Sequence, residues 1–241
     1  MAQPIKEKMI LALKTQLEKI KGGSYNRNFS AVVRAAPLFD LSDAGKIAIW
    51  PRYFQDEERV YSADRYDLDI RIQATDSVGN DEIPDTIANE IEADLIENLF
   101  GEVWAMAYTS GDSGLNDPDD MIGAAILAGA CSLLIESYTT TSGAWPAGDA
   151  AGIIYCRQKA GDYTATPIPV TIGGVGTFVG GTLTPKDKNA IIFPSPLKIQ
   201  GLDYLASGVD DYPQVDDNAV SVAMDVRLRF RTLPGNPYSQ P

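Results

Sequence analysis

Residues 220–231 read Val-Ser-Val-Ala-Met-Asp-Val-Arg-Leu-Arg-Phe-Arg, which is the longest alternation of apolar and polar side chains in the sequence. Every second position is apolar, so one face of the segment is apolar along its whole length. That period of two predicts a long β-strand with one buried face. The opposite face ends in three cations, Arg227, Arg229 and Arg231.

A second stretch, Tyr66–Gln73, alternates in the same way, with Asp67 and Asp69 among its polar positions. If the two strands pair antiparallel, the arginines of the first lie opposite these two aspartates. Such cross-strand pairs stabilise a sheet by about 0.2–1 kcal/mol each. A shorter run, Lys46–Trp50, predicts a further strand, which we expect to end at Pro51.

Two segments carry the periodicity of amphipathic helices. In Ile5–Ile20, apolar residues recur at steps of three and four, lysines occupy the other face, and Gly22-Gly23 provides a stop signal. Pro84–Phe100 is the second helix. Its predicted buried stripe is Ile83, Ile87, Ile91, Leu95 and Leu99, and its predicted outer face is acidic: Asp85, Glu90, Glu92, Asp94 and Glu97.

Between the second helix and the last strand the composition changes. Residues 102–198 are rich in Gly, Thr, Ala and Pro, and their short apolar runs are separated by turn signals. We therefore expect a β-rich insertion domain at 102–198, and a core domain formed by 1–101 together with 199–241. Met121–Ile135 is either a helix or a buried strand pair, and we favour the helix.

The net charge of −13 and the pI of about 4.4 limit the class of partner. A negative field disfavours tight binding of a polyanion such as DNA, although it suits a channel through which DNA passes without sticking. A need for solubility alone also explains the negative charge. The two cysteines allow one disulfide but no disulfide scaffold. We find no signal-peptide pattern, and the longest apolar stretch falls short of the roughly 20 residues of a membrane span. These features predict a soluble protein made in a reducing cytoplasm, with no membrane partner.

The sequence contains no histidine, which removes the usual general base. Gly111-Asp112-Ser113-Gly114 matches the tetrapeptide around the nucleophile of trypsin-like proteases, but that chemistry needs a histidine, so we interpret the match as a turn. The glycines at 173–176 and 180–181 lack the Gly-Lys-Ser/Thr of a phosphate loop and are typical of β-turns and bulges. We expect no enzyme activity, no catalytic residue, no cofactor and no metal site.

Clusters of charge remain. The acidic groups Asp117, Asp119 and Asp120, and later Asp210, Asp211, Asp216 and Asp217, lack EF-hand spacing, and we expect them in solvated loops. The arginines of the last strand would bind phosphate or pair with acidic residues within or between subunits; we favour pairing. Arg227, Arg229 and Arg231, with Asp67 and Asp69, therefore form a candidate charge face at a subunit interface or a lumen.

The order of these elements, together with the end of the sequence, forms a further pattern. It comprises the helix Ile5–Leu17, then Lys46–Pro51, the strand Tyr66–Gln73, the acidic helix Ile83–Phe100, and a terminal strand followed by Pro-Gly-Asn-Pro-Tyr at 234–238. This pattern resembles the tail-terminator family of tailed bacteriophages, whose members commonly finish with Gly-Asp-Pro-Tyr; here Asn236 replaces the Asp. The resemblance covers about 1–101 and 199–241, and it leaves the insertion unexplained.

The resemblance implies an α+β fold in which a mixed, mainly antiparallel sheet packs against two helices and carries the β-rich insertion domain. It implies a ring, usually a hexamer, in the neck of the virion. That ring caps the tail tube, stops its growth and joins the tail to the head side. The implied partners are further copies of the chain, the tail-tube protein, the head–tail connector or stopper protein, and the tail sheath if the tail is contractile. Genomic DNA passes through the lumen, and assembly takes place in the host cytoplasm.

Other functions remain open at this stage. A tail-tube subunit or a head-completion (stopper) protein is also a ring-forming virion protein. A carbohydrate- or surface-binding module would use the insertion, and a hydrolase would use a pair of carboxylates, although no pair stands out among the 33 Asp and Glu residues.

Overall fold

The fold is α+β and consists of two compact units. A computed structural model describes residues 3–21, 25–34, 44–60, 63–109, 118–128, 131–144, 150–161, 170–172, 176–178, 183–211 and 218–241. The core unit comprises Met1–Leu99 and Asn189–Pro241, and the inserted unit is Phe100–Lys188. The sequence placed the second boundary later, at 199, but residues 189–198 belong to the core unit.

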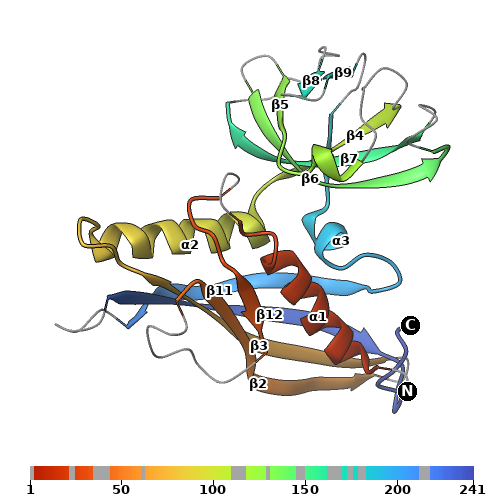
Figure 1. Ribbon diagram of the computed structural model, residues 1–241. Helices are drawn as coiled ribbons and strands as arrows, with labels where there is room; N and C mark the ends of the chain where they lie inside the picture. The colour runs from red at the N-terminus through yellow and green to blue at the C-terminus, as the bar shows by residue number, and fades with distance from the viewer. Residues whose placement is uncertain are drawn as a thin grey trace. The chain divides into compact units, whose positions relative to one another are not determined.

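The core unit is built on a five-stranded sheet of order β1-β2-β3-β12-β11 (Figure 1). The short β1 runs parallel to β2, and every other neighbouring pair is antiparallel, so the sheet is mixed and mainly antiparallel. The predicted antiparallel pairing of β3 with β12 is confirmed, with Asp69 opposite Arg227 and Asp67 opposite Arg229. The strands are β1 (Ala31–Val33), β2 (Lys46–Val60), β3 (Ala63–Ser77), β11 (Ile199–Asp211) and β12 (Ala219–Thr232).

Helices α1 (Ile5–Leu17) and α2 (Pro84–Phe100) lie on the same side of this sheet (Figure 1). Their apolar stripes are buried together with the apolar face of β3 and β12, and each large side chain buried in this way stabilises the fold by about 1.5–3 kcal/mol. The two helices are also tied to each other by buried hydrogen bonds: Gln16 Nε2 donates to the Asn98 carbonyl, and Asn98 Nδ2 donates to the Gln16 carbonyl, both at 3.1 Å. A short helix, α3 (Lys188–Ile192), precedes β11.

Three expectations about the core unit were wrong. The strand that begins at Lys46 does not end at Pro51. It continues to Val60 with a register shift between Pro51 and Tyr53, because β2 pairs with β1 only at its start and a proline is tolerated along the free edge beyond. The first helix ends at Leu17 and not at Ile20, whose buried side chain belongs to a turn.

The third correction concerns α2. Ile83 precedes the helix and is 64% exposed, although the four-residue repeat placed it in the buried stripe. Asp94, predicted on the acidic outer face, is buried. It accepts hydrogen bonds from Asn26 N, Asn26 Nδ2 and Arg27 N at 2.8–3.0 Å, so it fastens the segment after α1 to α2. Burial raises the pKa of the Asp94 carboxyl even though these donors favour its charged form.

The inserted unit contains a seven-stranded sheet of order β10-β4-β7-β6-β5-β8-β9. Its paired strands are all antiparallel. The strands β4 and β10, which come first and last along the chain, pair with each other, with Val103 opposite Lys186. The bounds are β4 (Val103–Thr109), β5 (Ala125–Ala128), β6 (Cys131–Ser142), β7 (Ala151–Ala160), β8 (Val170–Ile172), β9 (Gly176–Phe178) and β10 (Thr184–Lys186).

The helix that we favoured at Met121–Ile135 is wrong. A short 3₁₀ turn (Pro118–Met121) leads into the antiparallel pair β5–β6, with Ala128 opposite Cys131. A short apolar run has too few polar positions to distinguish the period of two of a strand from the period of 3.6 of a helix. The sequence pattern therefore could not decide between a helix and a strand pair here. Gly123 has φ of 84°, a conformation that interrupts a helix.

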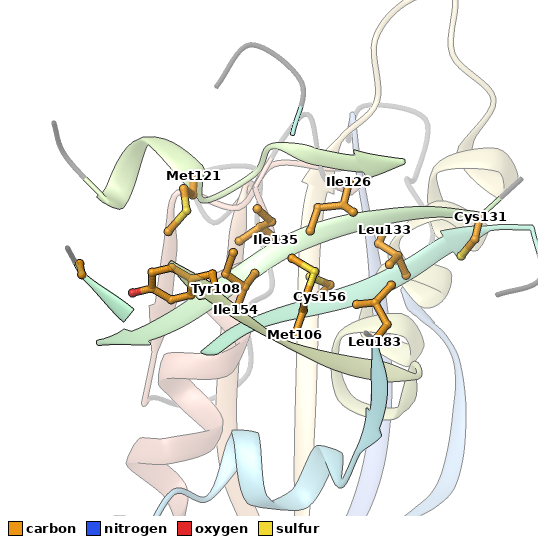
Figure 2. Close-up of a cluster of buried hydrophobic side chains, with 11 residues drawn as sticks. Met106, Tyr108, Met121, Ile126, Cys131, Leu133, Ile135, Ile154, Cys156 and Leu183 are labelled. Atoms are coloured by element: carbon orange, nitrogen blue, oxygen red, sulfur yellow. The ribbon is translucent and has the colours of Figure 1, made fainter. Parts of the chain in front are cut away.

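Side chains from β4, β5, β6 and β7 converge on one apolar cluster in the inserted unit (Figure 2). Both cysteines belong to it and are free thiols, so the disulfide that the sequence allowed does not form. Burial raises the pKa of the Cys156 thiol, and the nearby carboxylate of Glu136 raises it further. A buried ion pair adjoins this cluster: the Arg157 guanidinium donates through Nε and Nη2 to the two Glu136 carboxylate oxygens, the second bond being 3.0 Å.

Candidate functional site on the open face of the core sheet

The alternation of β3 and β12 gives the core sheet two different faces. The even-numbered residues of both strands point toward α1 and α2, and the odd-numbered residues point to the side on which Figure 1 shows no described helix. We call this second side the charged face. Its charged residues include Arg52, Asp67, Asp69, Arg71, Asp203, Asp210, Asp225, Arg227, Arg229 and Arg231.

Asp225 lies near the middle of the charged face and is held by two arginines. Arg71 donates from Nε and Nη2 to its two carboxylate oxygens, both at 2.8 Å, and Arg52 Nη1 donates to Oδ2 at 3.0 Å. The hydrogen bonds from Arg71 lower the pKa of Asp225, and the charges of Arg71 and Arg52 lower it further. Asp225 therefore stays ionised near neutral pH and is unsuited to general acid–base catalysis.

A polar cluster continues the network toward one end of the strands. Gln73 Nε2 donates to Asp210 Oδ2 at 3.0 Å and to Ser221 Oγ at 2.8 Å, and the Ser221 and Thr75 hydroxyls lie 2.9 Å apart. Gln73, Thr75 and Ser221 are all buried. Arg71 Nη1 also reaches Asp210 at 3.4 Å, so the two clusters form one network.

The predicted arginine row occupies the other end of the charged face. Arg227 donates from Nε and Nη2 to the Asp69 oxygens at 2.7 and 3.0 Å, and its Nε lies 4.0 Å from Asp67. Arg229 donates to Asp203 on β11, at 2.9 Å from Nε. Arg231 is exposed and lies beside the Gln200 amide, whose oxygen accepts from Nε at 2.9 Å when it faces the guanidinium.

These contacts confirm one of the pairings expected from the sequence and correct another. Pairing of Arg227 with the aspartates of β3 is confirmed, whereas Arg229 lies opposite Asp67 in register but bonds Asp203 instead. Asp210, expected in an acidic loop, ends up in the network of the charged face.

Other candidate residues are placed less fully. Asp211 is the last residue of β11, while Asp216, Asp217 and Asp117 lie outside the described residues, as does the segment 111–114 with its protease-like tetrapeptide. Asp119 accepts a hydrogen bond from the Tyr138 hydroxyl at 2.9 Å, and Asp120 lies in the 3₁₀ turn.

The central trio of Asp225, Arg71 and Arg52 was missed. Each residue lies at a polar position of its strand. Arg71 and Arg52 contact Asp225 only because their strands are close in the sheet, and these residues are more than 150 positions from Asp225 in the sequence. Asp203 was missed because β11 contains register shifts, one of them between Tyr204 and Ala206, and these break the alternation by which a strand is recognised.

The charged face is a network of paired charges. Its aspartates are engaged by guanidinium groups, and among the described residues no group of three or more His, Cys, Asp or Glu side chains is arranged to hold a metal ion. In the described parts of the chain, no helix has the length and apolar character needed to cross a membrane. Partly exposed ion pairs of this kind contribute little stability singly, but as a network they fix the positions of the side chains.

Comparison with models of known protein families gives no match, and comparison with curated proteins gives no significant relative.

Proposed function

We propose that the chain is a ring-forming structural subunit of a tailed-phage virion, acting as the tail terminator that caps the tail tube and joins the tail to the head side. The observation that carries the proposal is the core unit. The two ends of the sequence, which together resemble that family, form one compact unit without the middle of the chain. In this unit a mainly antiparallel sheet packs against two helices, as the resemblance implies.

The charged face supports a role beside DNA in transit. In a ring, a face with fixed, mutually paired charges offers phosphate groups few free cations, so DNA slides past and is not retained. The same face would also serve at a contact between subunits, where ion pairs fix the register of the partners.

The first experiment is mass photometry and negative-stain microscopy of the purified full-length chain. The proposal predicts one closed ring of defined mass, expected to be a hexamer, that does not lengthen as the concentration rises. Long tubes would favour a tail-tube subunit instead. A monomer that persists at high concentration would overturn the ring proposal.

A second experiment tests whether the charged face lines the lumen. Asp69→Asn together with Asp203→Asn removes one carboxylate partner from each of Arg227 and Arg229, and the variant ring is expected to retain double-stranded DNA in a salt-dependent way. The matched control is Glu102→Gln together with Asp187→Asn, which removes the same charge from exposed positions of the inserted unit. Equal DNA retention by both double variants would show that total charge, and not the charged face, controls binding.

A further inference from the structure

The turn before α2 presents an apolar side chain to solvent in a fixed position. Ile83 has the highest exposed fraction, 64%, among the large apolar side chains in the part of the chain that the structure describes. Its carbonyl accepts from Thr86 N and Ile87 N at 3.0 and 3.2 Å, and Pro84 fixes the first helical position. An exposed isoleucine on a preformed turn loses little conformational freedom when a partner covers it.

This turn is also strongly acidic. Asp81, Glu82 and Asp85 flank Ile83, and all three are exposed. Glu82 is held in place, because its Oε2 accepts from Gly79 N at 2.7 Å and its Oε1 lies 3.5 Å from Arg27 Nη1. We call residues 81–85 the acidic turn: one apolar side chain surrounded by three carboxylates.

A groove of about 480 Å³ lies elsewhere on the core unit, between α1 on one side and the end of α3 with the segment after it on the other. Its walls are mainly apolar and include Leu11 and Ala12 from α1, and Ile191, Pro194 and Leu197 from the other side. Two lysines, Lys8 and Lys19, also line it. Lys8 lies in the first half of α1 and Lys19 follows the end of that helix, so positive charge is present toward both ends of the α1 wall.

The acidic turn and the groove complement each other in shape and charge. An isoleucine with flanking carboxylates matches an apolar groove with flanking ammonium groups, and the groove volume lies in the range of about 300–1,000 Å³ that proteins use to enclose small ligands. Figure 1 shows the turn before α2 and the segment around α3 at opposite ends of the core unit, so a molecule cannot fill its own groove with its own turn.

We infer that copies of this chain join head to tail, with the acidic turn of one copy seated in the α1 groove of the next. The inference rests on the proposed function, which requires a ring, and it names the contact that builds that ring. A contact between two different surfaces of identical subunits closes into a ring or continues as a filament; contact between two identical surfaces would stop at a dimer.

The test uses the full-length chain with one variant on each surface. Ile83→Asp replaces the apolar side chain of the turn with a carboxylate, and Ala12→Glu places a carboxylate in the groove. Each variant alone is expected to weaken self-association by about ten- to hundredfold, the effect of losing one large buried apolar side chain. Ile122→Asp is the matched control, because Ile122 is 51% exposed but belongs to the inserted unit.

Mixing the two variants gives the sharper result. The Ala12→Glu copy keeps an intact turn and the Ile83→Asp copy keeps an intact groove, so a mixture is expected to form one-to-one pairs by mass photometry at concentrations where each variant alone is monomeric. Rings from either variant at wild-type concentration, or the absence of pairs on mixing, would overturn this contact. If Ala12→Glu lowers the melting temperature, Pro194→Glu at an exposed position of the opposite wall replaces it.

The outcomes separate the two proposals. A wild-type chain that remains monomeric defeats the proposed function and this contact together. A wild-type ring that survives both substitutions leaves the proposed function standing and removes only the contact between acidic turn and groove.

Discussion

The buried ion pair of the inserted unit gives a prediction whose size follows from its geometry. The side chains of Arg157 and Glu136 are only 2% and 3% exposed, and the guanidinium donates through two nitrogens to the two carboxylate oxygens. Arg157→Leu removes the cation and leaves the Glu136 carboxylate in the interior without its guanidinium partner. Breaking a buried pair in this way costs about 3–5 kcal/mol, whereas replacing both partners with apolar residues is often neutral or stabilising.

The cysteines provide an assay that reports on this unit alone. The chain has two cysteines, Cys131 and Cys156, and both are free, fully buried and located in the inserted unit. A thiol reagent reaches them only when that unit opens, so the labelling rate follows the free energy of opening. A loss of about 3–5 kcal/mol corresponds to labelling that is roughly 100- to 4,000-fold faster in Arg157→Leu than in the wild type.

The double variant Glu136→Leu with Arg157→Leu is the control for this prediction. It also removes the Glu136 carboxylate, so its labelling rate is expected to return to within about tenfold of the wild-type rate. An Arg157→Leu variant that labels as slowly as the wild type would refute the reasoning. So would a double variant that labels as fast as Arg157→Leu, because the cost would then lie in lost packing and not in an unpaired charge.

Three further substitutions test other parts of the structure. Asp225→Asn is expected to lower the free energy of unfolding by about 1–2 kcal/mol at pH 7. Because the folded-state pKa of Asp225 lies below its ordinary value of 3.8, this stability is lost as the pH falls through the folded pKa, and urea titrations should show the difference shrinking below pH 3.8; a constant gap would contradict the prediction. Gly152→Ala places a Cβ 1.7 Å from a carbonyl oxygen of β6 and should cost about 3 kcal/mol by thiol labelling. Gly208→Ala in the core unit, with nothing within 4 Å of the added Cβ, should leave urea denaturation unchanged, and a loss below 0.5 kcal/mol in Gly152→Ala would show that the clash is relieved. Asp94→Ala leaves two backbone N–H groups without their acceptor and should cost about 2 kcal/mol or more in urea denaturation, and a loss below 0.5 kcal/mol would show that water replaces the carboxylate.

Long, regular periodicities made parts of the fold predictable. The helix at Pro84–Phe100 has the predicted bounds, because its isoleucine and leucine repeat runs between a proline suited to the first helical position and a following glycine. The strands β3 and β12 were found by their alternation, which also placed Arg227 and Asp69 on a common face.

The remaining features depend on contacts that one segment does not reveal. The four-residue repeat includes Ile83, but the helix begins one residue later and the side chain stays outside. Asp94 is charged, so the sequence pattern placed it on the outer face. Its burial is explained by the backbone N–H groups of residues 26 and 27, which donate to its carboxylate. The network around Asp225 needed the strand order, which is set by packing between distant parts of the chain.

The two ends of the inserted unit lie next to each other. The Lys188 ammonium donates to the Phe100 carbonyl at 2.8 Å, and β4 pairs with β10 close by, where facing Cα atoms of an antiparallel pair lie about 4.5–5.5 Å apart. The inserted unit is therefore an exchangeable module: a few glycines and serines are long enough to join residue 99 to residue 189 in its absence. A domain whose own termini are equally close can be grafted at this position, so the inserted unit can be replaced while the core sheet keeps its connections.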